Sequence, residues 1–71
     1  MPYIAAPKDP ALPAEVEAFL ERHSMPATKF GRLAAGDPRF VLDMRICRIP
    51  RASTGARIRA WMNDYETGVA A

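Results

Sequence analysis

Apolar residues recur at helical spacing in four stretches of the chain, and a proline stands near the start of each stretch. In the first stretch the i, i+3, i+4, i+7 pattern of a helix with one buried side falls on Val16, Phe19, Leu20 and His23. Proline is tolerated in the first turn of a helix, because its missing N–H would have no partner there. The pattern therefore predicts a helix over residues 13–23, with Pro13 in its first turn.

The next two stretches predict short helices separated by a sharp break. One is predicted over residues 26–34, and its Phe30, Leu33 and Ala34 side chains are expected to face the core. Gly36, Asp37 and Pro38 then interrupt the pattern. Asp37 is a good N-cap and Pro38 suits the first helical position, so a third helix is expected to follow and to end near residue 46 or 47. Its apolar side comprises Phe40, Val41 and Met44.

The fourth stretch predicts a helix that begins at a Ser53 or Thr54 cap and ends near Asp64. Its apolar stripe comprises Ile58, Trp61, Met62 and Tyr65. Prolines keep residues 1–12 extended, as an arm, and residues 66–71 are expected to be frayed. The sequence thus predicts an all-α fold of four to five short helices, divided into an arm (1–12), a helical domain (13–64) and a tail (65–71).

Size and composition exclude several kinds of protein. A chain of 71 residues forms one domain and buries only about 60% of its unfolded surface, so we expect marginal stability. Cys47 is the only cysteine, so no disulfide forms; we expect it to be a small apolar plug, and His23 to be a half-buried packing residue. No apolar run has the length of a signal peptide or a membrane span, and we expect a cytoplasmic protein. Neither a nucleophile–base arrangement nor a glycine-rich phosphate loop is present, which predicts no enzyme, no cofactor, no metal and no small-molecule effector.

Positive charge is concentrated in the middle of the chain. Residues 28–59 hold eight basic and two acidic side chains, a net charge of +6, whereas residues 1–27 and 60–71 each carry −2. A basic surface built on a short helix, a tight turn and a second helix is typical of a protein that binds a phosphate backbone. The sequence therefore predicts a helix-turn-helix at the centre of the fold.

In a helix-turn-helix the second helix lies in the major groove, with its N-terminal residues at the base edges. Arg39 is expected there, because a guanidinium pairs with guanine O6 and N7. Asp43 is expected to accept from a cytosine amine or to orient Arg39, and Leu42 to contact a thymine methyl group. The candidate base-contacting residues are Arg39, Leu42, Asp43 and Arg45.

The remaining basic residues suggest contacts that position the protein without reading sequence. The candidate phosphate-contacting residues are Thr28, Lys29, Arg32, Arg48, Arg51, Arg57 and, on the same helix as Arg57, Arg59. The apolar stripe of the fourth helix continues to Val69 and is longer than a short bundle needs. We therefore expect a homodimer that forms through Trp61, Met62, Tyr65 and Val69.

Residues 14–62 resemble the lambda-repressor-like helix-turn-helix regulators of phages and bacteria. The resemblance is strongest to short alphaproteobacterial and prophage-type members, on Phe30-Gly31-Arg32, Gly36-Asp37-Pro38, Phe40-Val41, Asp43-Met44-Arg45 and Arg48-Ile49-Pro50. In this chain Ala35 stands where that family usually has the glycine of the turn, and Gly36 follows it. The resemblance implies a transcriptional regulator.

The expected function is sequence-specific binding of double-stranded DNA, as a homodimer associated with the nucleoid. The alternative is a small protein-interaction module, an adaptor or antitoxin-like protein, in which the fourth helix and the arm bind another protein. Steep salt dependence would distinguish DNA binding from an apolar protein interface.

Overall fold

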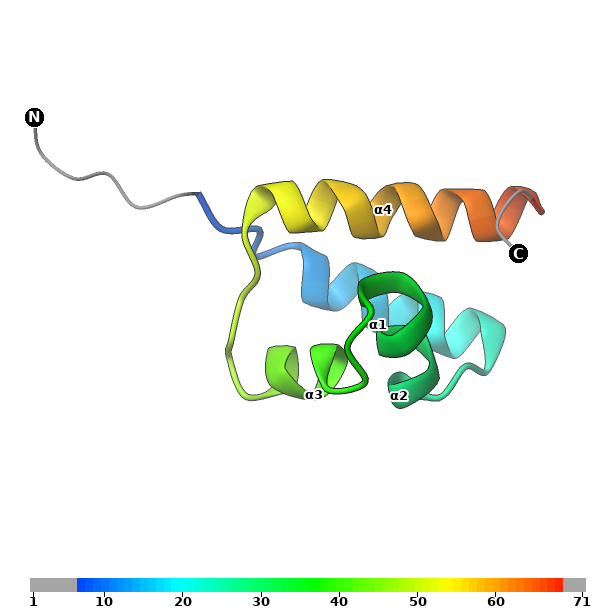
Figure 1. Ribbon diagram of the computed structural model, residues 1–71, viewed down its shortest axis with the longest axis horizontal. Coiled ribbons are helices and arrows are strands. Elements are labelled where there is room, and N and C mark those ends of the chain that lie inside the picture. The colour runs from blue at the N-terminus through cyan, green and yellow to red at the C-terminus, as the bar shows by residue number, and fades with distance from the viewer. Residues whose placement is uncertain (1–6, 69–71) are drawn as a thin grey trace, which may run out of the picture.

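Four α-helices and one π-helical turn make up the fold in the computed structural model, which describes residues 7–68. The elements are α1 (Leu12–His23), α2 (Ala27–Phe30), η1 (Gly31–Ala35), α3 (Phe40–Arg45) and α4 (Ala52–Thr67). In the view of Figure 1, α4 runs along one side of the molecule, α2 and α3 lie on the other side, and α1 lies between them. Between residues 7 and 68 the only strand-like pairing is one isolated antiparallel bridge between Lys8 and Arg51. The predicted all-α class is confirmed.

Phe19 of α1 is at the centre of the core. Its fully buried ring lies 5.5 Å from the ring of Phe30, 5.9 Å from Trp61, 5.4 Å from Tyr65 and 4.4 Å from His23, measured between centroids. The other buried apolar side chains are Leu12, Val16, Leu20, Met25, Phe30, Val41, Met44, Ile58 and Met62. They come from α1, α4 and the α2–α3 region, so burial of this apolar surface holds the helices together. His23 is half-buried beside Phe19, as the sequence indicated.

The fourth helix is longer than predicted at both ends. It begins at Ala52, before the expected Ser53 or Thr54 cap, because the carbonyl oxygen of Pro7 accepts the Ala52 N–H at 2.9 Å. It continues to Thr67 and ends at Gly68, which has a positive φ of 80°, so residues 66–67 belong to its last turn. The predicted arm also ends early, since Leu12 is the first residue of α1 and is fully buried.

The second helix is not a regular α-helix over its whole length. After the short α2, residues Gly31–Ala35 form a π-helical turn, which the sequence did not predict. A π-helix bonds residue i to i+5 instead of i+4, so side chains after Phe30 leave the α-helical register. Leu33 was predicted to point inward and is 48% exposed. That prediction was wrong because it assumed α-helical spacing.

Cys47 was predicted to be an apolar plug, which was also wrong, because its side chain is exposed. The residue follows the last turn of α3 with φ 67°, in the left-handed region. The N–H of Arg48 bonds to the carbonyl oxygen of Asp43 at 3.1 Å, and the N–H of Cys47 bonds to that of Met44 at 3.1 Å. This pair of bonds is a Schellman motif, in which glycine is the usual left-handed residue.

We therefore expect Cys47→Gly to stabilise the protein. A side chain in the left-handed region destabilises the folded state by about 1–2 kcal/mol. Glycine removes this strain, but its greater conformational entropy stabilises the unfolded state by about 0.4–1 kcal/mol. The expected net gain in the free energy of unfolding is about 0.5–1 kcal/mol, measured by urea denaturation. Cys47→Ala, which keeps the β-carbon, is the matched control and should give no such gain. A gain of equal size from both variants would assign the effect to the thiol instead of the backbone.

Candidate nucleic-acid interface

The turn between η1 and α3 holds Arg39 at the surface. A carboxylate oxygen of Asp37 accepts the N–H of Arg39 at 2.9 Å, and the carbonyl oxygen of Asp37 accepts the N–H of Phe40 at 3.1 Å. Asp37 was predicted to cap a helix that begins at Pro38, but the regular helix begins two residues later, at Phe40. Arg39 is therefore exposed in the turn that leads into α3 instead of lying within its first helical turn.

A close approach at Gly31 fixes the position of this turn. Gly31 is buried, and a β-carbon at this position would overlap the carbonyl oxygen of Asp37 and lie 3.2 Å from the carbonyl carbon of Pro38. Buried side chains of α3, Val41 and Met44, belong to the same core cluster as Phe30 of α2. The absence of a side chain at position 31 thus lets the turn and α3 pack directly against η1. Gly31 belongs to the Phe30-Gly31-Arg32 motif, but this packing role was not predicted from the sequence.

The predicted base-contacting residues differ in their exposure to solvent. Arg39 is exposed and Leu42 is 41% exposed, while Asp43 is half-buried. Asp43 has no ion-pair partner in the described part of the chain, so its carboxylate does not orient Arg39 here. Ile46, which follows the last residue of α3, is 73% exposed and gives this region a second exposed apolar side chain besides Leu42.

Arg45 is held by α1. Its Nε donates to one carboxylate oxygen of Glu17 at 2.7 Å, and its Nη2 donates to the other at 2.9 Å. Hydrogen bonding by Arg45 holds the pKa of Glu17 below its usual value, and Glu17 raises the pKa of Arg45. A bidentate pair of this kind fixes both side chains, so the guanidinium of Arg45 is engaged and connects α3 to α1.

Arg59 is likewise held by ion pairs within the folded protein. It donates to both oxygens of Glu15, at 2.9 and 2.7 Å, and it also pairs with the carboxylate of Asp9. Hydrogen bonds from Arg59 lower the pKa of Glu15 and of Asp9, and these carboxylates raise the pKa of Arg59, Glu15 most strongly. The earlier assignment of Arg59 to a phosphate therefore does not fit, because two carboxylates already hold this guanidinium.

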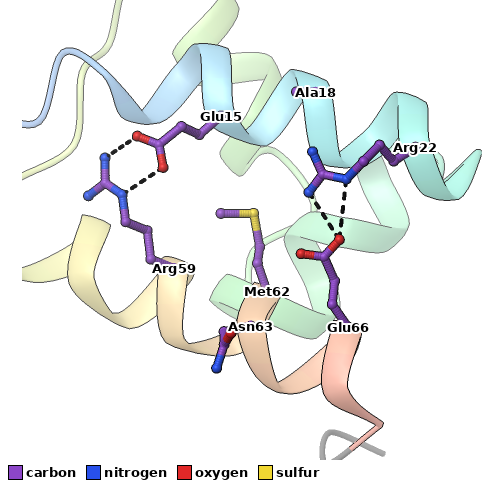
Figure 2. Close-up of a pocket in the computed structure, with 7 residues that line it drawn as sticks. All are labelled: Glu15, Ala18, Arg22, Arg59, Met62, Asn63 and Glu66. Carbon is purple, nitrogen blue, oxygen red and sulfur yellow. Dashed lines mark hydrogen bonds and ion pairs between the residues drawn. The ribbon is translucent and has the colours of Figure 1, made fainter.

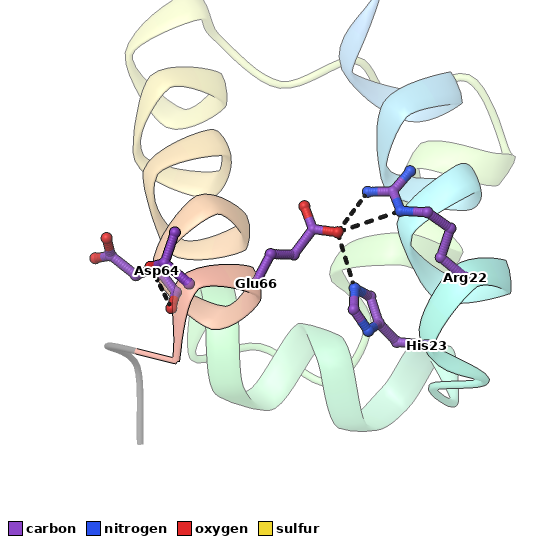
Figure 3. Close-up of polar contacts among 5 residues, drawn as sticks. Arg22, His23, Asp64 and Glu66 are labelled. Carbon is purple, nitrogen blue, oxygen red and sulfur yellow. Dashed lines mark hydrogen bonds and ion pairs between the residues drawn. The ribbon is translucent and has the colours of Figure 1, made fainter.

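On the surface between α1 and α4, arginine and glutamate side chains form ion pairs with one another. A cavity of about 310 Å³ lies there, and the pairs Arg59–Glu15 and Arg22–Glu66 border it in Figure 2. Figure 3 shows Glu66 accepting from both Arg22, at 3.1 Å, and His23, at 3.0 Å. The hydrogen bond from His23 has the largest effect on Glu66, and together with those from Arg22 it lowers the pKa of Glu66. Because each cation on this side has a carboxylate partner, this surface offers little net charge to a polyanion.

The remaining cations have no such partners. Of the ten Lys and Arg residues, only Arg22, Arg45 and Arg59 lie within 4.0 Å of an acidic group of residues 7–68. The seven others are exposed: Lys8, Lys29, Arg32, Arg39, Arg48, Arg51 and Arg57. They come from the arm, α2 and η1, the turn, the linker before α4, and α4. Thr28, the second residue of α2, is also exposed.

A second cavity, of about 460 Å³, lies between α3 and the linker. Three of the unpaired cations line it: Lys8, Arg48 and Arg51. Its apolar lining includes Phe40, Met44, Ile49 and Pro50, and Asp43 supplies its one carboxylate. We call this feature the linker groove. Arg48 and Arg51 were predicted to contact phosphates, whereas Lys8 was not, because no local sequence pattern connects it to them.

The apolar stripe of α4 is mostly folded inward. Met62 is only 7% exposed, and Trp61 and Tyr65 are half-buried, with their rings stacked at 5.3 Å and packed on Phe19. Of the predicted dimer residues, Val69 lies outside the described residues. Among the predicted dimer residues that the structure describes, only Trp61 and Tyr65 therefore keep appreciable exposed side-chain surface.

Within residues 7–68 no helix combines the length and the hydrophobicity that crossing a membrane requires. The same residues contain no group of three or more His, Cys, Asp or Glu side chains suited to a metal ion. In comparisons with models of known protein families, with curated proteins and with solved structures, this chain matched none.

Proposed function

We propose that the chain binds double-stranded DNA in a sequence-specific manner and regulates transcription. The observation that carries the proposal is the division of its cations. The three paired cations link α1 to α3, α4 and the arm, whereas six of the seven unpaired ones lie between residues 28 and 59. Cations without carboxylate partners are available to phosphates, and phosphate neutralisation supplies most of the affinity of DNA-binding proteins.

In this proposal α2 with η1, the turn and α3 act as a helix-turn-helix. The close packing of the turn on Gly31 supports it, because the motif needs a fixed angle between its two helices. The left-handed residue Gly36, with φ 68°, supports it too. A π-helical turn contains one residue more per hydrogen bond than an α-helical turn. This extra residue accounts for a glycine at position 36, one place later than in the family that the chain resembles.

The base contacts are assigned to the turn and to the exposed side of α3. Arg39 reads guanine, and Leu42 contacts a thymine methyl group, with Asp43 as a further candidate for cytosine. Arg45 is assigned a structural role, since both oxygens of Glu17 accept hydrogen bonds from its Nε and Nη2. Thr28, Lys29, Arg32, Arg48, Arg51 and Arg57 are proposed to contact phosphates.

The dependence of DNA affinity on salt tests the proposal. With about five to seven phosphates neutralised, the logarithm of the binding constant should fall with the logarithm of salt concentration at a slope of roughly −5 to −6. The measurement uses fluorescence anisotropy on a duplex selected from random sequences. Arg22→Ala removes a cation from the compensated α1–α4 surface and should leave the slope unchanged. A wild-type slope near zero, or no binding to any duplex at low salt, would refute the proposal.

Arg39→Ala and Arg48→Ala are expected to weaken binding in different ways. Because Arg39 is assigned to a base, its loss should cost about 1–3 kcal/mol on the selected site and relax the preference at one base pair. Because Arg48 is assigned to a phosphate, its loss should weaken all sequences alike. Binding of each variant to the selected duplex and to a scrambled duplex separates the two effects. Equal losses on both duplexes for Arg39→Ala would contradict its assignment.

We also propose that two copies bind one palindromic site, since a single helix with two or three base contacts discriminates poorly. Trp61 and Tyr65 are half-buried and are assigned to the contact with the second copy. Sedimentation of the protein with a palindromic duplex should give two chains per duplex. A strict one-to-one complex at high protein concentration would show that the protein binds as a monomer.

The alternative function, a protein-interaction module, was expected to use the fourth helix and the arm. The described part of the arm packs on the linker and on α4, and the stripe of α4 faces the core. No feature of their described residues favours a protein partner, and DNA binding is the function we retain.

A further inference from the structure

The N-terminal arm is attached to the linker and to α4 by three separate contacts. The N–H of Asp9 donates to the carbonyl oxygen of Pro50 at 3.0 Å, and the N–H of Ala52 donates to that of Pro7 at 2.9 Å. The carboxylate of Asp9 binds Arg59. Gly55 makes room for this carboxylate, because a β-carbon at position 55 would overlap it. Lys8 therefore occupies a defined position, although residues 7–11 form no regular helix or strand.

The bridge brings two like charges together. The two hydrogen bonds flank Lys8 and Arg51 and do not join them, so these residues form a non-hydrogen-bonded antiparallel pair. Side chains approach most closely in such pairs, and like charges placed directly opposite each other are unfavourable. No acidic group of residues 7–68 lies within 4.0 Å of either cation. The fold thus holds two like charges at the linker groove, and neither has an ion-pair partner among residues 7–68.

The linker groove adds a third cation and an apolar lining. Arg48 also lines the groove, so three cations from the arm and the linker converge on a space of about 460 Å³. Asp43 supplies one negative charge there, which leaves a net charge of +2 (three positive, one negative). Phe40, Ile49 and Pro50 give the groove an apolar part beside the cations. This combination suits an anion that carries an apolar group.

We propose that the linker groove binds a phosphodiester of the DNA backbone, and that Lys8, held by the arm, is one of its ligands. The phosphate lies among Lys8, Arg48 and Arg51, and an adjacent deoxyribose packs on the apolar lining. The inference rests on the proposed function and adds to it a binding residue and a role for the arm. Occupancy of the groove relieves the repulsion between Lys8 and Arg51, so DNA binding also strengthens the attachment of the arm.

Salt dependence of DNA binding tests the role of Lys8. Lys8→Met keeps most of the side-chain stem and removes the charge, so the salt slope should become less steep by about 0.9. Gly55→Ala is the second variant: it displaces the Asp9 carboxylate and loosens the arm while Lys8 keeps its charge. Gly55→Ala should make the salt slope less steep by a similar amount. The double variant should have nearly the same slope as either single variant, because both substitutions remove the same contact. Circular dichroism and thermal unfolding check that each variant is folded.

Two results of this experiment would overturn the inference while leaving the proposed function intact. One is a wild-type slope for Lys8→Met on a duplex that the wild-type protein binds. The other is a normal slope for Gly55→Ala together with a reduced slope for Lys8→Met. That pattern would mean that Lys8 contributes only through the net charge of the protein and not through its fixed position.

A titration without DNA separates failure of the groove from failure of the proposed function. Inorganic phosphate is added to the isotope-labelled protein at constant ionic strength, with acetate in a parallel titration. Saturable shifts of the Lys8, Arg48 and Arg51 amides with phosphate, reduced in Lys8→Met, support the anion site even if no duplex is bound. Equal shifts with acetate would overturn the assignment to a phosphodiester.

Discussion

Replacing Phe19 with alanine is expected to unfold a large fraction of the protein. The ring is fully buried and packs against Phe30, Trp61 and Tyr65, which come from α2 and α4. Removing a buried phenylalanine ring costs about 3–5 kcal/mol, since transfer energy is lost and a cavity remains. Native proteins are stable by roughly 0.05–0.15 kcal/mol per residue. The total stability of a chain this short is therefore little larger than the cost of removing the Phe19 ring. Urea denaturation followed by circular dichroism gives the free energy of unfolding.

Ile46→Ala is the matched control for Phe19→Ala. It also removes a large apolar side chain, but Ile46 is 73% exposed. A change at such a surface position should stay within about 0.5 kcal/mol. A cost below about 1 kcal/mol for Phe19→Ala would contradict the central place of this ring in the core.

Gly31→Ala is expected to destabilise the protein by about 1–3 kcal/mol, the usual cost of overpacking. The added methyl group meets backbone atoms of Asp37 and Pro38, which cannot rotate away as a flexible side chain would. The turn must shift, and Arg39 and α3 shift with it. Sequence-based reasoning alone gives the opposite sign, because alanine favours a helix over glycine by about 1 kcal/mol.

Gly36→Ala separates steric overlap from backbone strain. Position 36 has open space for a side chain but a φ of 68°, so the expected cost is about 1–2 kcal/mol of strain, and neither turn nor helix is forced apart. Both variants are measured by urea denaturation and by binding to the selected duplex. Gly31→Ala should lower the DNA affinity of the folded protein more than Gly36→Ala does. An increase in stability for Gly31→Ala would show that the turn does not pack against this residue.

Local patterns in the sequence were sufficient to predict much of the fold. Helical spacing gave α1 and α4, and Gly36 and Asp37 marked the break before α3. These features depend on residues three to seven positions apart, whose relative directions follow from helix geometry. One error fell where a distant contact extended a helix, since Pro7 accepts the N–H of Ala52 and α4 begins before the expected Ser53 or Thr54 cap. The other fell where the local geometry left α-helical spacing, since the π-helical turn changes the direction of Leu33.

Which cations are free was decided by the tertiary structure alone. The sequence by itself fixed the +6 charge of residues 28–59 and the positions of its basic side chains, but not their partners. Glu17 lies 28 residues from Arg45, and Asp9 lies 50 residues from Arg59. Pairs this distant form only when the helices pack, because their separation in space depends on the whole fold. The same packing placed Lys8 opposite Arg51 and so assembled the linker groove.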